Sequence, residues 1–224
     1  MRIVLLVTLL GAPVQEKKRA PSMDYGPFLC ASFVLKPDAK FDNSTGHFDG
    51  PSVARGVAVR LADDWSAGAI FDMDTLRWAG GWKGGALKFR GVIFDGSHGP
   101  CPTLGVPPAF VSPAGPGWAR NGSFTDPRPD SIAPLPRPGP LPKEWAKYKG
   151  LYVHGRQVVL HYSVGKTDVL DSIALEGEAF ARTLRVEAST AELELLVADP
   201  SGGLTITTVD PPPGLSHVST GGTS

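Results

Sequence analysis

The feature that most constrains the fold is a series of strand-length apolar stretches in the second half of the chain. Over residues 158–164 apolar and more polar residues alternate, so the apolar set lies on one face of an extended segment. Similar stretches follow at 169–175, 180–186 and 193–197, at a spacing of roughly 10 residues. Short strands in this rhythm, the first two joined by a tight turn near Gly165, are typical of a β-sandwich or barrel.

The first half of the chain shows the same tendency. The whole chain of 224 residues holds 27 glycines and 22 prolines, which favours many turns and short strands over long helices. Strand-length apolar or alternating stretches occur at 25–35, 57–61, 69–76 and 87–94, and 63–68 is a hairpin turn between the second and third. We expect antiparallel pairing here, and a last strand at 204–208.

Between Gly99 and Pro142 the pattern stops, because 13 of these 44 positions are proline. Proline donates no ladder hydrogen bond, so the segment is an irregular connection. It is either a loop that covers the sandwich, anchored by Trp118, Phe124 and Ile132, or a linker between two halves; the tryptophan favours the cover. The predicted fold is therefore all-β, an antiparallel β-sandwich spanning 21–209 with a long proline-rich covering loop at 99–142.

The chain begins with Arg2 and an apolar run from Ile3 to Ala12, which is the layout of a signal peptide over residues 1–20. The run is shorter than the roughly 20 residues that a membrane-spanning helix needs, and no other segment is long enough. A buried first strand is the alternative. We expect a periplasmic or extracellular protein, and residues 210–224 have the composition of a linker.

Charge and cysteine content narrow the partners. Lysine plus arginine (22) balance aspartate plus glutamate (22), so no overall field attracts nucleic acid or an acidic membrane surface. Of the two cysteines, Cys30 and Cys101, each could pair with the other in an oxidising compartment. Two unpaired buried thiols are the alternative.

Asp72 and Asp74 are the first candidates for chemistry. Two residues apart on a strand, they would point to one face with Cα atoms roughly 7 Å apart. That spacing permits a paired-carboxylate glycan hydrolase, and it permits two oxygen ligands for calcium. The plainer interpretation puts both acids on the solvent face while Phe71 and Met73 fill the core.

Trp78 and Trp82 are the second candidates, because they flank Gly80 and Gly81. Exposed aromatic rings beside a flexible turn would suit stacking against a sugar ring or a neighbouring domain. Core packing at a strand corner is the alternative, since tryptophan is highly buried on average.

Three stretches together resemble an uncharacterised N-terminal β domain of large exported planctomycete and verrucomicrobial proteins. The similarity covers most of residues 25–200. The first stretch is GVAVRL at residues 56–61 with AIFDMDTLRWAGGWKGG at 69–85. The second is GW at 117–118 with GSFTDPR at 122–128. The third is YKGLYVHG at 148–155, followed by VVLHYSVG at 158–165.

Proteins with that domain often also carry a sugar-dehydrogenase-like propeller and a c-type cytochrome, so the resemblance implies a redox or carbohydrate setting. Cys30 and Cys101 lie far apart and form no Cys-x-x-Cys-His motif, so covalent haem attachment to this chain is excluded. The resemblance implies no catalytic residues.

Two functions follow as expectations. The first is a non-catalytic accessory module that docks to a neighbouring redox or propeller domain or binds a polysaccharide, without a cofactor other than calcium. The alternative is a glycan-cleaving enzyme that uses Asp72 and Asp74.

Overall fold

The computed structural model describes residues 2–8, 24–42, 44, 47–88, 101–129, 139–197 and 205–209. All regular structure in these residues is β-strand, which confirms the predicted fold class. None of the described residues forms a helix that is long and apolar enough to cross a membrane.

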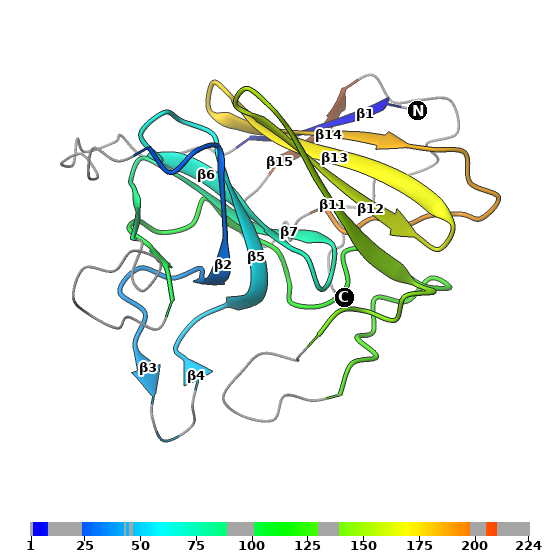
Figure 1. Ribbon diagram of the computed structural model, residues 1–224, viewed down its shortest axis with the longest axis horizontal. Coiled ribbons are helices and arrows are strands. Elements are labelled where there is room, and N and C mark those ends of the chain that lie inside the picture. Colours follow the sequence, from blue (N-terminus) through cyan, green and yellow to red (C-terminus); the bar gives the residue numbers. More distant parts are fainter. Residues whose placement is uncertain are drawn as a thin grey trace.

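One layer is a six-stranded antiparallel sheet on the right of Figure 1, drawn mostly in yellow-green to orange, with its N-terminal strand in blue. Its strands, in spatial order, are β11 (Ala146–His154), β12 (Gln157–Val164), β13 (Thr167–Glu176), β14 (Ala179–Val186), β1 (Arg2–Thr8) and β15 (Thr205–Val209). The first four are consecutive hairpins. Gly155, Gly165 and Gly177 have positive φ in the three turns, and the turn at Gly165 is where it was predicted.

The other layer is a seven-stranded sheet, blue to green on the left of Figure 1. Its order is β10 (Phe110–Val111), β7 (Arg77–Lys83), β6 (Ala67–Asp72), β5 (Ser52–Arg60), β2 (Phe28–Val34), β9 (Thr103–Leu104) and β8 (Leu87–Lys88). β2 and β9 run parallel, so this sheet is mixed rather than purely antiparallel. A separate small hairpin joins β3 (Phe41–Asp42) to β4 (His47–Phe48).

The main core lies between the two sheets. Alternate residues of β12 face inward as the sequence predicted, with Leu160 and Tyr162 fully buried. Phe71 of β6 lies against Tyr162 with ring centroids 5.6 Å apart, which joins the two layers. Tight packing of such rings across the layers is what an aligned sandwich requires.

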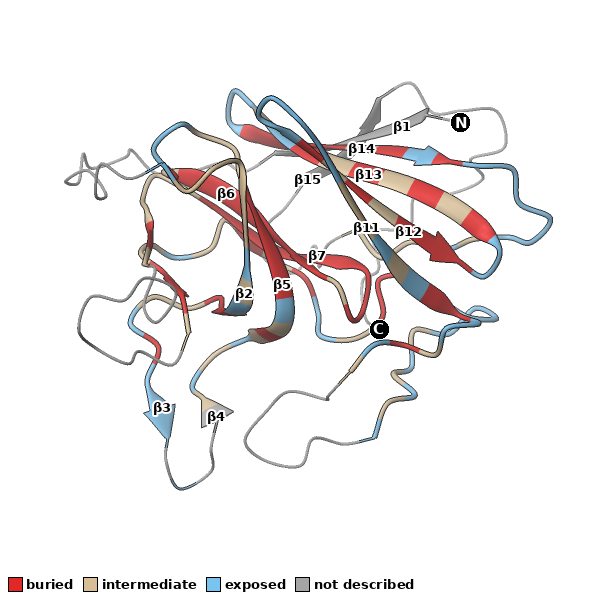
Figure 2. Cartoon of the chain, in the orientation of Figure 1, coloured by how far each residue is buried: buried red, intermediate tan, exposed pale blue. Residues whose placement is uncertain are grey.

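A second apolar cluster lies on the opposite face of the seven-stranded sheet. It includes Phe33, Leu35, Ile70 and Trp82, and it is covered by Leu104 and its neighbours in the segment after residue 101. All six residues of β6 are therefore buried, and Figure 2 shows β6 and most of β7 in red along their length. A strand covered on both faces loses the alternation that marks a half-exposed strand.

The proline-rich segment is a cover, at least over the part that the structure describes. Trp118 is 3% exposed and packs in the main core, and its backbone bridges Leu195. Phe124 is only half-buried, and Ile132 lies outside the described residues. The strand predicted at 193–197 is reduced to that single bridge, in which the Ala119 N–H donates to the Glu194 carbonyl and the Leu196 N–H to the Gly117 carbonyl, both at 2.9 Å.

Several predicted boundaries shift at the ends of the chain and at residue 88. The apolar start of the chain forms β1, which pairs with β14 and β15. The alternative interpretation of this segment, as a first strand, therefore agrees with the structure. Export stays a prediction. The strand predicted at 87–94 is described only as Leu87–Lys88, and residues 9–23 and 210–224 lie outside the described residues.

Candidate functional site

Asp72 and Asp74 do not lie side by side on a strand. β6 ends at Asp72, and residues 73–76 form the turn into β7. The Asp72 Oδ1 accepts hydrogen bonds from the backbone N–H groups of Asp74 at 2.9 Å and Thr75 at 3.4 Å. A carboxylate that caps its own turn in this way stabilises the turn.

Both acids are buried, which corrects the prediction of a solvent face. The side chains of Asp72 and Asp74 are 8% and 2% exposed, and arginines neutralise them. Arg55 Nη1 donates to Asp74 Oδ1 at 2.8 Å, and Arg77 Nη2 lies 3.7 Å from Asp72 Oδ2. Removing either arginine would leave an unpaired buried charge, so the acids form a structural ion cluster.

The proline-rich cover closes this cluster. Arg77 Nη1 donates to the Ser112 carbonyl at 3.1 Å, and the Leu141 N–H donates to the Asp74 carbonyl at 2.9 Å. The Arg128 guanidinium is held by three hydrogen bonds to the Asp126 carboxylate and also donates to the Gly139 carbonyl at 2.9 Å. The turn that carries the acids is therefore covered by loop backbone at Ser112 and Leu141, and its carboxylates are paired with neighbouring arginines.

Burial raises the pKa of Asp74, and the charge of Asp72 adds to this effect while Arg55 opposes it. A raised pKa would suit a general acid, but the Asp74 side chain is only 2% exposed and its Oδ1 is bound by Arg55, so a substrate oxygen has little access to it. No group of three or more histidine, cysteine, aspartate or glutamate side chains in the described part of the chain could hold a metal ion. Calcium ligation by these acids stays a prediction.

The two tryptophans are buried and lie on opposite faces of the sheet. Trp78 is 2% exposed in the main core, and Trp82 is fully buried in the second cluster. Residues four apart on a regular strand share a face, but the register shifts between β6 and β7, with Phe71 opposite Trp78 and Ile70 opposite Gly80. The bulge at Ala79 reverses the facing. The predicted exposed pair is wrong, and the core alternative holds.

Gly80 and Gly81 lie inside β7 and not in a turn. A Cβ at Gly80 would lie 2.3 Å from Leu35 Cδ2 and 2.8 Å from the Phe110 carbonyl oxygen. A Cβ at Gly81 would lie 2.5 Å from the Phe110 ring. The glycines are there because neighbouring side chains and β10 approach the backbone closely on both faces.

The Trp78 indole belongs to a polar network within the main core. Its Nε1–H donates to Asp171 Oδ1 at 3.0 Å, and the Tyr162 hydroxyl donates to Asp171 Oδ2 at 2.8 Å. Arg182 binds the same carboxylate through Nε at 3.1 Å and Nη2 at 2.6 Å. Trp118 Nε1–H donates to the Tyr162 hydroxyl at 3.3 Å, which ties the proline-rich cover to the network.

This network is fully enclosed. Asp171 is fully buried and Arg182 is 3% exposed. Burial and the charge of Asp171 raise the pKa of Tyr162 well above its usual range. Burial alone would lower the pKa of Arg182, but the facing Asp171 carboxylate outweighs it and raises that pKa. A substrate cannot reach these groups, so the network is structural.

The cysteines are both free. Cys30 lies exposed in β2, opposite Val57 of β5, and Cys101 is half-buried at the start of the described part of the cover. The structure therefore lacks the Cys30–Cys101 disulfide, and the thiols are not fully buried either. Partial burial raises the pKa of both thiols, which makes them poor nucleophiles at neutral pH.

The polar and aromatic groups that do reach solvent gather on the outer face of the six-stranded sheet. Inward-facing residues alternate with outward-facing ones, as the red and tan bands of β13 show in Figure 2. In the outward set, His161 of β12 lies opposite Leu170 of β13, which lies opposite Arg185 of β14. One step along, Ser163 lies opposite Asp168.

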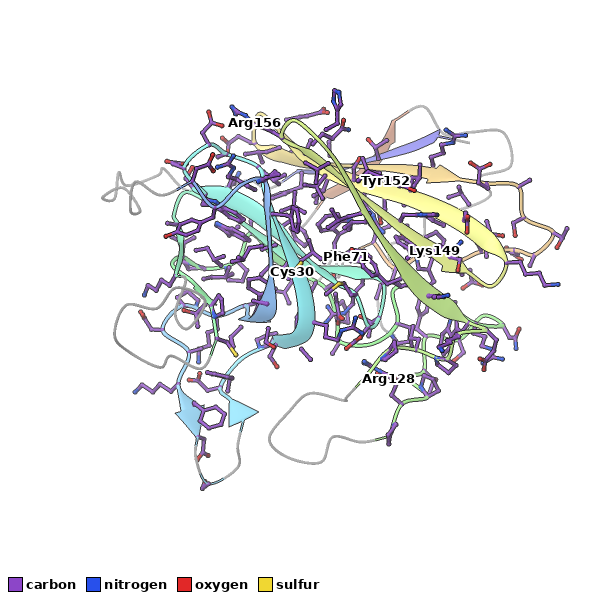
Figure 3. The ribbon with its side chains drawn as sticks, in the orientation of Figure 1. Cys30, Phe71, Arg128, Lys149, Tyr152 and Arg156 are labelled. Carbon is purple, nitrogen blue, oxygen red and sulfur yellow. The ribbon has the colours of Figure 1, made fainter. Side chains whose placement is uncertain are left out.

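Tyr152 of β11 stands at the edge of this face. Its side chain is on the hairpin strand, beyond Lys149 along β11 in Figure 3. Tyr152 is 56% exposed, and its ring lies nearly parallel to the His161 ring, at an angle of 25° and a centroid distance of 5.8 Å. The Tyr152 hydroxyl lies 3.4 Å from His161 Nδ1. The two rings form a fixed aromatic surface beside a strand edge.

Charged groups border the rings. Lys149 Nζ is paired with Asp168 Oδ1, and His161 Nε2 lies 3.4 Å from Asp168 Oδ2. The bond to Lys149, supported by His161, holds the pKa of Asp168 below its usual range. Tyr152, His161, Asp168, Leu170 and Glu187 line one open depression of about 510 Å³. We call these five residues the outer-face depression.

Sequence reasoning passed over the outer-face depression although a signal for it existed. The alternation that puts Leu160 and Tyr162 inward requires His161 to face outward. Tyr152 pairs with Val159 in the unbroken part of the β11–β12 hairpin, between the turn and the bulge, so the same alternation puts it on the outward face. The register shift between Tyr148 and Gly150 affects the position of Lys149 instead, and it has no clear mark in the sequence beyond Gly150 itself, whose φ is +148°.

Comparison with known proteins gives one match. A sequence family described as a domain of unknown function (DUF6797) matches residues 69–171, from β6 into β13. This stretch holds the acid turn, β7, the cover and the first hairpin of the six-stranded sheet. No curated protein and no solved structure matches the chain.

Proposed function

We propose that the chain is a non-catalytic interaction module of an exported multidomain protein with a redox or carbohydrate-related role. The observation that carries the proposal is the state of the two acids most suited to catalysis. Asp72 caps a turn with Oδ1, and Asp74 is bound by Arg55, with 8% and 2% of the respective side chains exposed. Asp74 Oδ2 has no hydrogen-bond partner among the described residues, but both carboxyl groups are buried and therefore poorly accessible to a substrate.

The alternative, a glycan-cleaving enzyme, needs two carboxyl groups that reach a glycosidic oxygen and the anomeric carbon. Asp72 and Asp74 sit beneath the cover that Ser112 and Leu141 hold in place. A sugar would have to displace that backbone and break the ion pair to Arg55. The cost of exposing unpaired buried charges argues against this route.

An interaction role draws support from the outer face of the six-stranded sheet. That face carries exposed aromatic and charged side chains on a rigid hairpin sheet, without an enclosed site around them. Rigid strands that present side chains at fixed spacing suit recognition of a neighbouring domain or of a glycan. The exported, multidomain setting rests on the apolar N-terminal segment and on the resemblance described above.

The test of non-catalysis uses the whole chain. Purified protein is incubated with soluble starch, hydroxyethyl cellulose, galactomannan and xylan, and new reducing ends are measured. We expect none above the buffer control. Release of reducing ends that disappears in Asp72→Asn, while the near-ultraviolet circular dichroism of that variant matches the parent, would establish the enzyme instead.

The test of export is separate. Residues 1–20 are fused to a β-lactamase that lacks its own leader, and ampicillin resistance reports translocation. We expect resistance, and none when Leu5 and Leu6 are replaced by arginine. N-terminal sequencing of the exported full chain then shows whether the segment of β1 is removed or kept in the sheet.

A further inference from the structure

We propose that the outer-face depression binds one uncharged sugar unit of a glycan, with the sugar ring packed against the stacked side chains of Tyr152 and His161. The inference rests on the proposed function and adds to it a site and a ligand class. None of the residues suspected from sequence alone takes part.

The first argument is the shape of the aromatic surface. The apolar C–H face of a pyranose packs on an exposed aromatic ring, and tyrosine offers such a face at a low cost in side-chain entropy. Tyr152 and His161 stack at an interplanar angle of 25° with centroids 5.8 Å apart, so the His161 ring supports the more exposed Tyr152 ring against which a sugar would pack. Leu170, opposite His161 on β13, extends the apolar floor.

The second argument is the placement of hydrogen-bonding groups. The backbone N–H of Glu187, the residue after β14, donates to the Asp168 carbonyl at 3.0 Å, so these two acidic residues lie next to each other in the lining of the depression. Carboxylate oxygens accept hydrogen bonds from sugar hydroxyl groups, and the Lys149 ammonium can donate hydrogen bonds to sugar hydroxyl oxygens. An apolar floor with acceptors and a donor at one side fits a ring that has apolar faces and hydroxyl edges.

The third argument is charge balance. Lys149 pairs with Asp168, and Arg185 Nε lies 3.2 Å from Glu187 Oε1. The two cations and two anions cancel around the depression, so it attracts neither a polyanion nor a polycation. An uncharged polyhydroxylated ligand suits this field better than a sulfated or uronic-acid polymer.

The fourth argument is preorganisation. Asp168 is held by Lys149 on β11 and by His161 on β12, and it lies on β13, so three strands fix one side chain. His161 is held between that carboxylate and the Tyr152 hydroxyl. A site that is already ordered loses little entropy when it binds.

Affinity electrophoresis of the whole chain tests the proposal, with soluble starch, hydroxyethyl cellulose, galactomannan and xylan cast in separate gels. We expect retardation in at least one of them and weaker or no retardation in dextran sulfate. Tyr152→Ala should weaken binding roughly tenfold or more, as loss of a central aromatic contact does. Tyr152→Phe should keep most of the binding, because it keeps the ring.

Val153→Ala is the matched control. Val153 is the next residue on the same strand and is 45% exposed, but it pairs with the buried Val158 and therefore faces the other side. It should bind like the parent. Because Tyr152 is more than half exposed, the alanine variant should fold, and His161→Gln supplies a second variant that tests the same surface.

Three results would overturn the proposal: retardation by none of the four uncharged polysaccharides, retardation by dextran sulfate alone, or retardation that Tyr152→Ala and His161→Gln leave unchanged. Failure of the proposed function looks different, since it appears as new reducing ends in the same samples. If the chain neither cleaves nor binds polysaccharide, the sugar site is rejected and docking to a neighbouring domain stands as the proposed role.

Discussion

Arg182 of β14 binds Asp171 of β13 through two hydrogen bonds in the interior of the sandwich, with Nε 3.1 Å from Oδ1 and Nη2 2.6 Å from Oδ2. Their side chains are 4% and 0% exposed. Trp78 and Tyr162 donate to the same carboxylate from both layers of the fold. Because every one of these groups would cost free energy if left unpaired, the network fixes how the two sheets face each other.

Breaking this pair from one side should be costly. Asp171→Asn or Arg182→Met is expected to lower the free energy of unfolding by about 3–5 kcal/mol, because each leaves a buried charge unpaired or half-bonded. Asp171→Leu combined with Arg182→Met should cost less than the sum of its single changes. Urea denaturation followed by tryptophan fluorescence measures all of them.

The matched control for this pair is Arg185→Met on the same strand. Arg185 faces outward, its side chain is 65% exposed, and it pairs with Glu187. An exposed ion pair contributes at most about 1 kcal/mol, so this variant should stay within that range. Equal losses in Arg182→Met and Arg185→Met would contradict the role assigned to the buried network.

Gly80 should tolerate no side chain. In Gly80→Ala the new Cβ would press on Leu35 Cδ2 at 2.3 Å and on the Phe110 carbonyl oxygen at 2.8 Å. We expect a loss of about 1–3 kcal/mol in the free energy of unfolding, as for other overpacked interiors. Adding Leu35→Val should restore only part of it, since the Phe110 backbone cannot retreat. A neutral Gly80→Ala in thermal unfolding would show that β7 has room.

Tyr162 should make stability depend on pH in the alkaline range. Its pKa is raised in the fold by burial and by Asp171, so below about pH 10 both folded and unfolded chains hold the proton. Above that pH only the unfolded chain releases it, and the free energy of unfolding falls as pH rises. Burial raises the pKa of Tyr148 from 10.0 to about 12, so Tyr148 adds to the fall in the free energy of unfolding between about pH 10 and pH 12.

Tyr162→Phe separates this effect from the other titrating groups. Urea denaturation at several pH values between 9 and 11.5 should show a shallower fall for the variant than for the parent. The variant also loses the bond to Asp171 and should start from a lower stability, by about 0.5–1.5 kcal/mol. Parallel curves for the two proteins would rule out a raised pKa for Tyr162.

Both cysteines should titrate as thiols. In denaturant and without reductant, Ellman's reagent is expected to react with both, and Cys30→Ser should remove one equivalent. In the folded chain at neutral pH the reaction should be slow, because partial burial raises the pKa of each thiol. Reactivity that appears only after reduction would demonstrate the disulfide that this structure lacks.

The sequence predicts the alternating strands of the six-stranded sheet well, because one face of each is buried and the other is not. The same alternation carries a signal for the buried ion pair. Asp171 stands between Val169 and Ile173 on the inward face, and Arg182 between Phe180 and Leu184. A charge at an inward position of an apolar series indicates a partner across the sheet, although it does not say which one.

The acid turn and the tryptophans were harder to interpret because β6 and β7 are buried on both faces. Because apolar and polar residues do not alternate in these strands, the sequence pattern does not show the end of β6 at Asp72 or the bulge at Ala79. Glycine in β7 indicates a turn or a close contact equally well, and only the position of Leu35 decides between them. The position of Lys149 beside the outer-face depression depends on the bulge near Gly150 and so required the structure.

We place ligand recognition on the outer face of the six-stranded sheet, away from the acid turn and the tryptophans. The direct measurement is a ¹H–¹⁵N NMR titration of the whole chain with a hexasaccharide of whichever uncharged polysaccharide retards it. We predict shifts at the amides of Tyr152, His161 and Leu170, and indole N–H signals of Trp78 and Trp82 that stay in place. Shifts of those two indole signals, with the outer-face amides unmoved, would contradict it.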